Sequence, residues 1–128
     1  MAVYRSGRFN GIYTPQNVVV LCSPLTYSSG FNLMTALSKK GATIVGTPSA
    51  QPGNNFGDSL ILQLKNTGIQ AFVAFKQLVS FPDDPEKGRL FPIDHPLTFA
   101  KLASTGFDPN AEVLLALEVI ASGTNRRP

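Results

Sequence analysis

The 128-residue chain contains one cysteine, one histidine and no tryptophan. Cys22 alone cannot form an intrachain disulfide, and a zinc site built from Cys and His would have only Cys22 and His95 to draw on. We therefore expect no metal and no other cofactor. Cys22 follows three valines and a leucine, which is typical of a buried strand thiol rather than a reactive nucleophile.

Long apolar runs and strong charge are also missing. The longest apolar run, residues 18–22, is of strand length, so we expect no membrane span, and residues 1–11 lack the apolar core of a signal peptide. Charged residues make up 15% and hydrophobic residues 43%, a balance that excludes a disordered chain. The net charge of +3 includes Arg126 and Arg127, and most other basic residues are scattered, so we expect no nucleic-acid partner.

The length suits one domain. We expect an irregular lead-in over residues 1–16, a single α/β domain over 17–121 and a flexible tail over 122–128. Glycine and proline interrupt the lead-in, whereas alternating strand and helix patterns fill the middle of the chain.

The first half of that domain predicts a β-α-β unit. Residues 17–22 are apolar and β-branched, as in the central strand of a parallel sheet, and residues 42–46 form a second short strand. Between them we expect a helix over about 29–40, with Leu33, Met34 and Leu37 on its buried face and Gly41 as its cap.

The second half predicts antiparallel and helical structure. Residues 47–57 have a loop composition, and strands over 58–64 and 69–75 would form a hairpin through residues 65–68. The proline-broken stretch 81–88 predicts an exposed loop. Two helices, near 96–104 and over 109–121, would close the chain, the second with Asp108 as its N-cap.

Ser28 is the candidate for a catalytic nucleophile. Ser28 lies where the first strand turns into the first helix, so the helix N-terminus and the N–H of Ser29 could stabilise an oxyanion beside it. The simpler interpretation is that Ser28 or Ser29 only caps the helix. Spacing alone does not decide between the two.

Several segments, taken in order, add a family resemblance. The sequence Thr-Tyr-Ser-Ser-Gly at 26–30 follows a valine-rich strand, and Gly-Ala-Thr-Ile-Val-Gly at 41–46 follows the helix. Leu-Lys-Asn-Thr-Gly at 64–68, Phe-Pro-Ile-Asp-His-Pro at 91–96 and the stretch from Phe107 to Glu118 come later. Together, over about residues 15–121, they resemble the C-terminal half of the catalytic domain of the tail-specific (C-terminal processing) serine peptidases.

The resemblance implies a Clp-protease/crotonase-like α/β fold: a β-α-β unit, then an antiparallel hairpin and two C-terminal helices. It also implies Ser28 as the nucleophile and the Ser29 backbone N–H as an oxyanion donor. The family's general-base lysine would fall in the loop at 51–55, which has none, and Lys39 and Lys40 lie roughly 16 Å along the helix from Ser28. Gly30 and Phe31 stand where the family has a helix glutamate.

The remaining ionisable residues are weaker candidates for catalysis. His95 stands between Asp94 and Pro96 and is interpreted as a turn or helix-start residue. Asp83 and Asp84 belong to a solvated loop, and Glu86 beside them is a remote candidate for the acidic member of a Ser/His/Glu set.

Two functions follow as expectations. In the first, the chain is part of a longer serine peptidase, a hydrolase that cleaves the peptide bonds of a peptide or protein substrate through an acyl-enzyme. The alternative is a binding or assembly module without the Ser/Lys dyad. The isolated chain is expected to be inactive. Its expected partners are the missing N-terminal half of the domain or another subunit, with self-association, and the resemblance implies the cell envelope or export.

Overall fold

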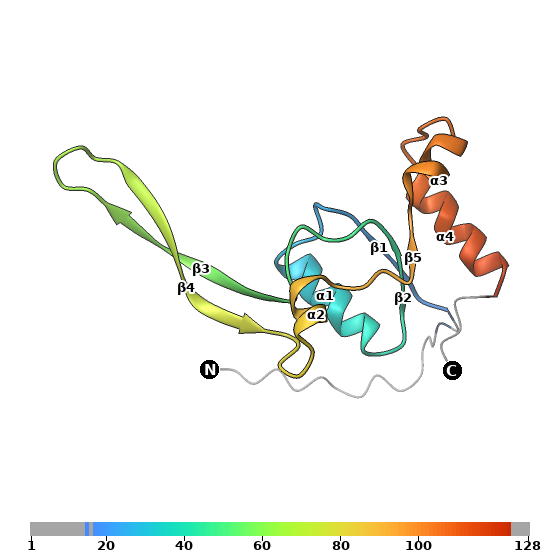
Figure 1. Cartoon of the computed structure of the whole chain (residues 1–128), viewed down its shortest axis with the longest axis horizontal. Coiled ribbons are helices and arrows are strands. Elements are labelled where there is room, and N and C mark those ends of the chain that lie inside the picture. Colours follow the sequence, from blue (N-terminus) through green and yellow to red (C-terminus); the bar gives the residue numbers. More distant parts are fainter. Residues whose placement is uncertain (1–14, 16, 124–128) are drawn as a thin grey trace.

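The computed structural model describes residue 15 and residues 17–123. In that part the chain forms a small parallel sheet, helices on both sides of it, and a long hairpin that extends away from the sheet (Figure 1). The expected lead-in over 1–16 falls almost wholly outside the described residues, as does most of the tail over 122–128. None of the helices in the described ranges is long and apolar enough to cross a membrane.

The sheet contains three parallel strands in the order β1-β2-β5, namely β1 (Val19–Cys22), β2 (Thr43–Gly46) and β5 (His95–Pro96). The β-α-β unit is therefore confirmed, with Val20 paired to Ile44. The prediction that residues 17–22 form the central strand is wrong. All four residues of β2 are buried, whereas Leu21 of β1 is 41% exposed, because β1 pairs with one strand only among the described residues.

Helix α1 (Ser29–Ser38) begins and ends close to the expected bounds. Gly41 follows it with a φ of 92°, the left-handed conformation that a capping glycine supplies. The predicted buried face is partly wrong: Met34 is buried, but Leu33 is 60% exposed and Leu37 only half-buried. The buried stripe instead follows Phe31, Met34 and Thr35, and Phe31 and Met34 pack against Cys22 and Ile44 of the sheet.

Two small cores lie on opposite faces of the sheet. On one face Phe31 packs edge-on against Phe91, with ring centroids 5.8 Å apart, beside Cys22, Met34 and Ile44. On the other face Val45 packs against α4 (Ala111–Ala121). Successive residues of β2 thus contribute to different layers, as the alternation of a strand requires, and the architecture is mixed α/β in three layers.

The hairpin joins β3 (Asn54–Gln63) to β4 (Gln70–Val79). Its existence and its turn are confirmed, but both strands are longer than the pattern predicted. Residues 54–57 pair with 76–79, so the predicted loop over 47–57 ends earlier than expected. Asn54 anchors the root, since its side chain donates to the carbonyl of Phe81 and accepts from the N–H of Phe81.

Two elements between the hairpin and the C-terminal helices were not predicted. The stretch 81–88, expected to be a loop, contains helix α2 (Pro85–Arg89), which Asp84 caps by accepting a hydrogen bond from the N–H of Lys87. That bond lowers the pKa of the Asp84 carboxyl. His95 lies in strand β5, paired with Val45, so its interpretation as a turn or helix-start residue is wrong.

The two C-terminal helices are present but shorter than predicted. Helix α3 (Phe99–Ser104) begins after the N-cap Thr98, because residues 95–96 are used by β5. Helix α4 begins at Ala111, with Asn110 rather than Asp108 at its N-cap position. The Asp108 carboxylate instead accepts from the N–H of Asn110 and closes a turn before the helix.

Candidate functional site

The turn between β1 and α1 is fastened by its own polar groups. The hydroxyl of Thr26 accepts from the N–H of Ser23, and the N–H of Thr26 donates to the carbonyl of Ser23. The hydroxyl of Ser49, in the loop after β2, donates to the carbonyl of Thr26. Segments far apart in the sequence thus hold the residues that lead into Ser28.

Ser28 itself has an unusual backbone conformation. Its φ is 54° and its ψ is −123°, a region that residues with a side chain rarely adopt and that costs on the order of 1–3 kcal/mol. The residue stands at the N-cap position of α1, yet its side chain makes no cap hydrogen bond, and it is exposed. The hydroxyl is therefore not occupied by the capping role that would explain it most simply.

Gln51 holds this strained residue from the side. Its side-chain oxygen accepts a hydrogen bond of 2.6 Å from the N–H of Ser28. The N–H of Gln51 in turn donates to the hydroxyl of Ser49, so one loop supports both the turn and Ser28. Sequence reasoning noted this loop only for its lack of lysine and missed the role of Gln51.

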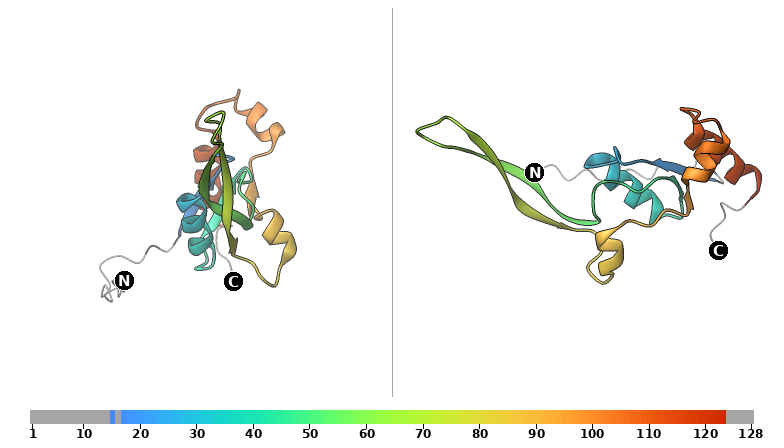
Figure 2. Two further views of the ribbon diagram at one scale, coloured as in Figure 1. Left: turned by 90° about the vertical axis from the view of Figure 1, so that its left-hand side faces the viewer. Right: turned by 45° about the horizontal axis from the view of Figure 1, so that its top comes forward.

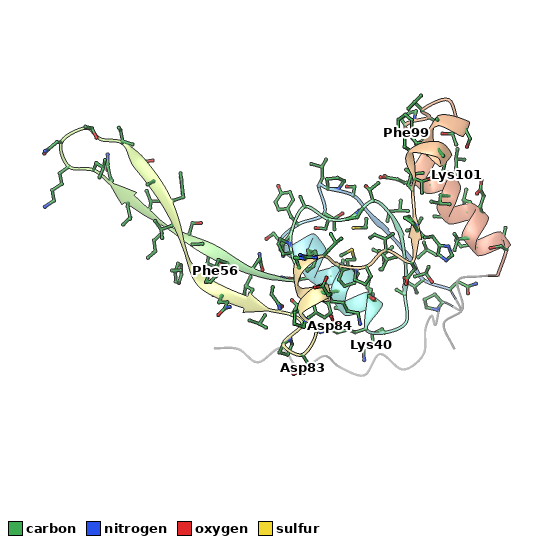
Figure 3. The ribbon with its side chains drawn as sticks, in the orientation of Figure 1. Lys40, Phe56, Asp83, Asp84, Phe99 and Lys101 are labelled. Carbon is green, nitrogen blue, oxygen red and sulfur yellow. The ribbon has the colours of Figure 1, made fainter. Side chains whose placement is uncertain are left out.

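A hollow of about 370 Å³ opens beside Ser28, between the start of α1 and the root of the hairpin. Figure 3 shows Phe56 on the hairpin near this root. The lining contains hydroxyl, amide, charged and apolar groups, a mixture that could hold a peptide segment. The residues are Ser28, Asn32, Gln51, Asn55, Phe56, Gly57, Asp58, Lys76 and Leu78.

The hollow contains one lysine and one carboxylate, which pair with each other. The Lys76 ammonium lies 3.0 Å from the Asp58 carboxylate, and both side chains are more than half exposed. No hydrogen bond joins Lys76 to the Ser28 hydroxyl within the ranges that the structure describes. Sequence reasoning missed both residues, although extending the predicted hairpin pairing would have placed Lys76 opposite Gly57.

An oxyanion donor is available next to Ser28. The N–H of Ser29 is at the start of α1, and it has no hydrogen-bond acceptor within the described part of the chain. Free N–H groups at a helix N-terminus carry partial positive charge. The exposed hydroxyl of Ser28 is thus next to the unpaired backbone N–H of Ser29.

The structure does not bring the other candidate residues to this hollow. Glu86 is in α2, where its carboxylate pairs with Arg89 at 3.2 Å, and it lines a different hollow. His95 is in β5 and lines neither. Ser28 is at the N-cap position of α1, whereas Figure 3 shows Lys40 at the C-terminal end of this helix, and Asp83 and Asp84 on the turn before α2. No group of three or more His, Cys, Asp or Glu side chains suited to a metal ion occurs in the described ranges.

Comparison with known proteins adds no assignment. No protein-family model, no curated protein and no solved structure matches this chain.

Proposed function

We propose that this chain supplies the nucleophile half of a serine peptidase of the tail-specific type, with a Clp-protease/crotonase-like α/β fold. The Ser28 oxygen would attack the carbonyl carbon of a peptide bond, and its proton would pass to a base. The amine would then leave with a proton, and water would release the acyl group from Ser28. The Ser29 N–H would bind the oxyanion in both steps.

One observation carries the proposal: Ser28 keeps a strained backbone without using its hydroxyl as a cap. A serine retained only for capping would adopt the extended region and accept from an N–H in the first turn, as Thr98 does from Lys101 in α3. Ser28 does neither. A strained, exposed hydroxyl beside a free N–H is the arrangement that acyl transfer requires.

The order of elements supports the fold assignment. The resemblance requires a β-α-β unit with the serine after its first strand, followed by an antiparallel hairpin, and the chain has both in that order. The extra short elements α2 and β5 lie between the hairpin and the two final helices. β5 widens the small sheet by one strand on the side of β2 away from β1, and Ser28 still follows β1.

The general base is the missing part. Lys39 and Lys40 are at the wrong end of α1, and Lys76 is paired with Asp58. We assign the base to the N-terminal half of the domain or to another subunit, and we expect the isolated chain to be inactive. Loss of a single oxyanion donor already lowers turnover by about 10² to 10³.

The same gap favours a second candidate function, a binding or assembly module that keeps the fold without the chemistry. No histidine or lysine is hydrogen-bonded to the Ser28 hydroxyl in the described residues. Peptide-bond cleavage by the isolated chain that disappears in Ser28→Ala would exclude this second function.

The test is active-site labelling of the longest protein that the gene encodes. A fluorophosphonate reacts with activated serine hydroxyls, and mass spectrometry of the digested protein identifies the labelled residue. We expect labelling at Ser28, loss of the label in Ser28→Ala, and labelling retained in the matched variant Ser29→Ala, which keeps the backbone N–H. A folded protein that stays unlabelled at Ser28 would refute the peptidase proposal and leave the binding module.

A further inference from the structure

The hairpin β3–β4 extends from the rest of the described chain as an arm (Figure 2). Ten residues in each strand correspond to about 34 Å of length. Its described contacts with the body lie at the root, where Asn54 bonds to Phe81 and Gly53 lies against the Phe81 ring. The outer part of the arm therefore has only its own two strands for support.

One face of the arm is apolar from Leu60 to the turn, whereas nearer the root Gln77 lies opposite Phe56. Cross-strand pairs such as Leu60–Val73 and Leu62–Ala71 alternate with pairs that belong to the other face. The large side chains of this apolar face are 47–60% exposed. They are Leu60, Leu62, Leu64, Ile69, Val73 and Phe75.

Among the described residues of the arm, no charged side chain belongs to this apolar face. Asp58 would interrupt it by position, but its φ of 49° breaks the alternation, and its carboxylate pairs with Lys76. Lys76 belongs to the other row, since it is opposite Gly57. The other face is mixed, with Ser59, Gln63 and Gln70 beside Ile61 and Phe72.

Such a face is unstable when it is left in water. A lone two-stranded hairpin is marginal, and it becomes stable when its apolar face is covered. The six large side chains present on the order of 500–600 Å² of apolar surface, which is at the upper end of patches on monomers and below the ~800 Å² per partner of a standard interface.

We propose that the apolar face of the arm packs against the same face of a second copy of this chain, as two sheets packed face to face about a twofold axis. A second arm matches this face in length, width and lack of charge, which a self-complementary contact requires. Two such faces, fully covered, would together bury about 1,000–1,200 Å², which reaches the lower end of specific interfaces. The proposal does not depend on the chemistry of Ser28.

The length of the arm argues against the missing half of the domain as the occupant. That half would complete the sheet beside β1, whose outer edge is unpaired among the described residues. The apolar residues near the tip, including Leu62, Leu64 and Ile69, are at the opposite end of the molecule from α4, which packs on that sheet (Figure 1). A second arm can lie along all of them, whereas a partner seated at β1 would have to span the length of the molecule.

The experiment compares adjacent residues on opposite faces. Leu62 and Ile61 are 54% and 59% exposed, so a lysine at either position disturbs the folded arm to a similar extent. The full chain, Leu62→Lys and Ile61→Lys are measured by sedimentation equilibrium, with circular dichroism as the folding control. We expect a dimer for the natural chain, at least a 100-fold weaker dimer for Leu62→Lys, and a dimer within threefold of the natural chain for Ile61→Lys.

Three outcomes would overturn the proposal: a natural chain that is monomeric at 100 μM, a dimer unaffected by Leu62→Lys, or equal weakening by both variants. If Leu62→Lys is unfolded by circular dichroism, Leu62→Thr, with a side chain that favours strands, takes its place and is expected to weaken the dimer at least tenfold. Ser28 labelling is measured separately, so the two proposals fail independently.

Discussion

The backbone N–H of Ser28 donates a hydrogen bond of 2.6 Å to the side-chain oxygen of Gln51, a residue 23 positions further along the chain. This contact joins the turn before α1 to the loop after β2. It fixes a residue whose φ of 54° and ψ of −123° are unfavourable for any residue with a side chain. The position of the Ser28 hydroxyl therefore depends on a loop that carries no family-like catalytic residue.

Replacement of Gln51 tests that dependence. We expect Gln51→Ala to lower the free energy of unfolding by about 0.5–1.5 kcal/mol, because the N–H of Ser28 loses its acceptor. In the longest protein that the gene encodes, we also expect slower fluorophosphonate labelling of Ser28, since its backbone is no longer held in the strained region. Urea denaturation and labelling rates provide the measurements.

Gln63→Ala is the matched control, because the Gln63 amide makes only an exposed 3.3 Å contact with the carbonyl of Gly68 on the hairpin turn. It should leave the Ser28 labelling rate unchanged. A labelling rate that is the same in Gln51→Ala and in the natural chain would contradict a positioning role for Gln51.

A second prediction separates strain from capping at Ser28. Ser28→Ala should change the free energy of unfolding by only a few tenths of a kcal/mol, because no cap hydrogen bond is lost. Thr98→Ala should cost about 1 kcal/mol, because the Thr98 hydroxyl caps α3 by accepting from the N–H of Lys101. Ser28→Gly should stabilise the chain by up to about 1 kcal/mol, since glycine tolerates positive φ. A loss of 1 kcal/mol or more in Ser28→Ala, measured in urea, would show that the hydroxyl has a structural role.

Local patterns predicted the β-α-β unit and the hairpin because those segments carry strong signals of their own. The valine run before Cys22, the positive-φ glycine at 41 and the short turn before Ile69 each determine local structure without distant partners. The order of strands could not be obtained in this way. β5 contributes two residues, His95 and Pro96, which is too short for any periodicity to appear.

The site was predicted only as far as it is local. Ser28 and Ser29 are neighbours at a strand-to-helix turn, and that turn is visible in the sequence. Gln51 reaches the hollow through the loop after β2, which has no local pattern. Lys76 reaches it because the hairpin pairing continues past the predicted strand ends. The strain at Ser28 was also invisible, because φ depends on tertiary contacts that fix the turn.

A pair of glycines provides the third prediction. A methyl group at Gly46 would overlap the carbonyl oxygen of Cys22 on the paired strand, and its φ of 124° suits only glycine, so Gly46→Ala should cost at least about 2 kcal/mol. Gly30, in the first turn of α1, has no atom within 4 Å of that methyl group, so Gly30→Ala should stabilise the chain by about 0.5 kcal/mol. Thermal and urea unfolding of both variants provide the measurement, and equal effects would contradict the close approach of β1 and β2.

The thiol of Cys22 makes stability depend on alkaline pH. Cys22 is 1% exposed, and burial raises its pKa above the ordinary value of 9.0. The unfolded chain therefore loses its thiol proton first, so the stability that the neutral thiol contributes is complete below pH 9 and is lost as the pH rises through the folded pKa. We expect the unfolding free energy of the natural chain to fall with pH above 9, by up to about 1.4 kcal/mol per pH unit for one proton.

Tyrosine and lysine residues titrate in the same range, so the comparison is made against Cys22→Ala. The difference in unfolding free energy between the two chains should be constant from pH 6 to 8 and should shrink above pH 9, because only the natural chain has the buried thiol. Alkylation by iodoacetamide should follow the same order, being slow in the folded chain and fast in urea. A constant difference up to pH 10.5 would show that the thiol ionises equally in the folded and unfolded chains, and therefore that Cys22 is reached by water.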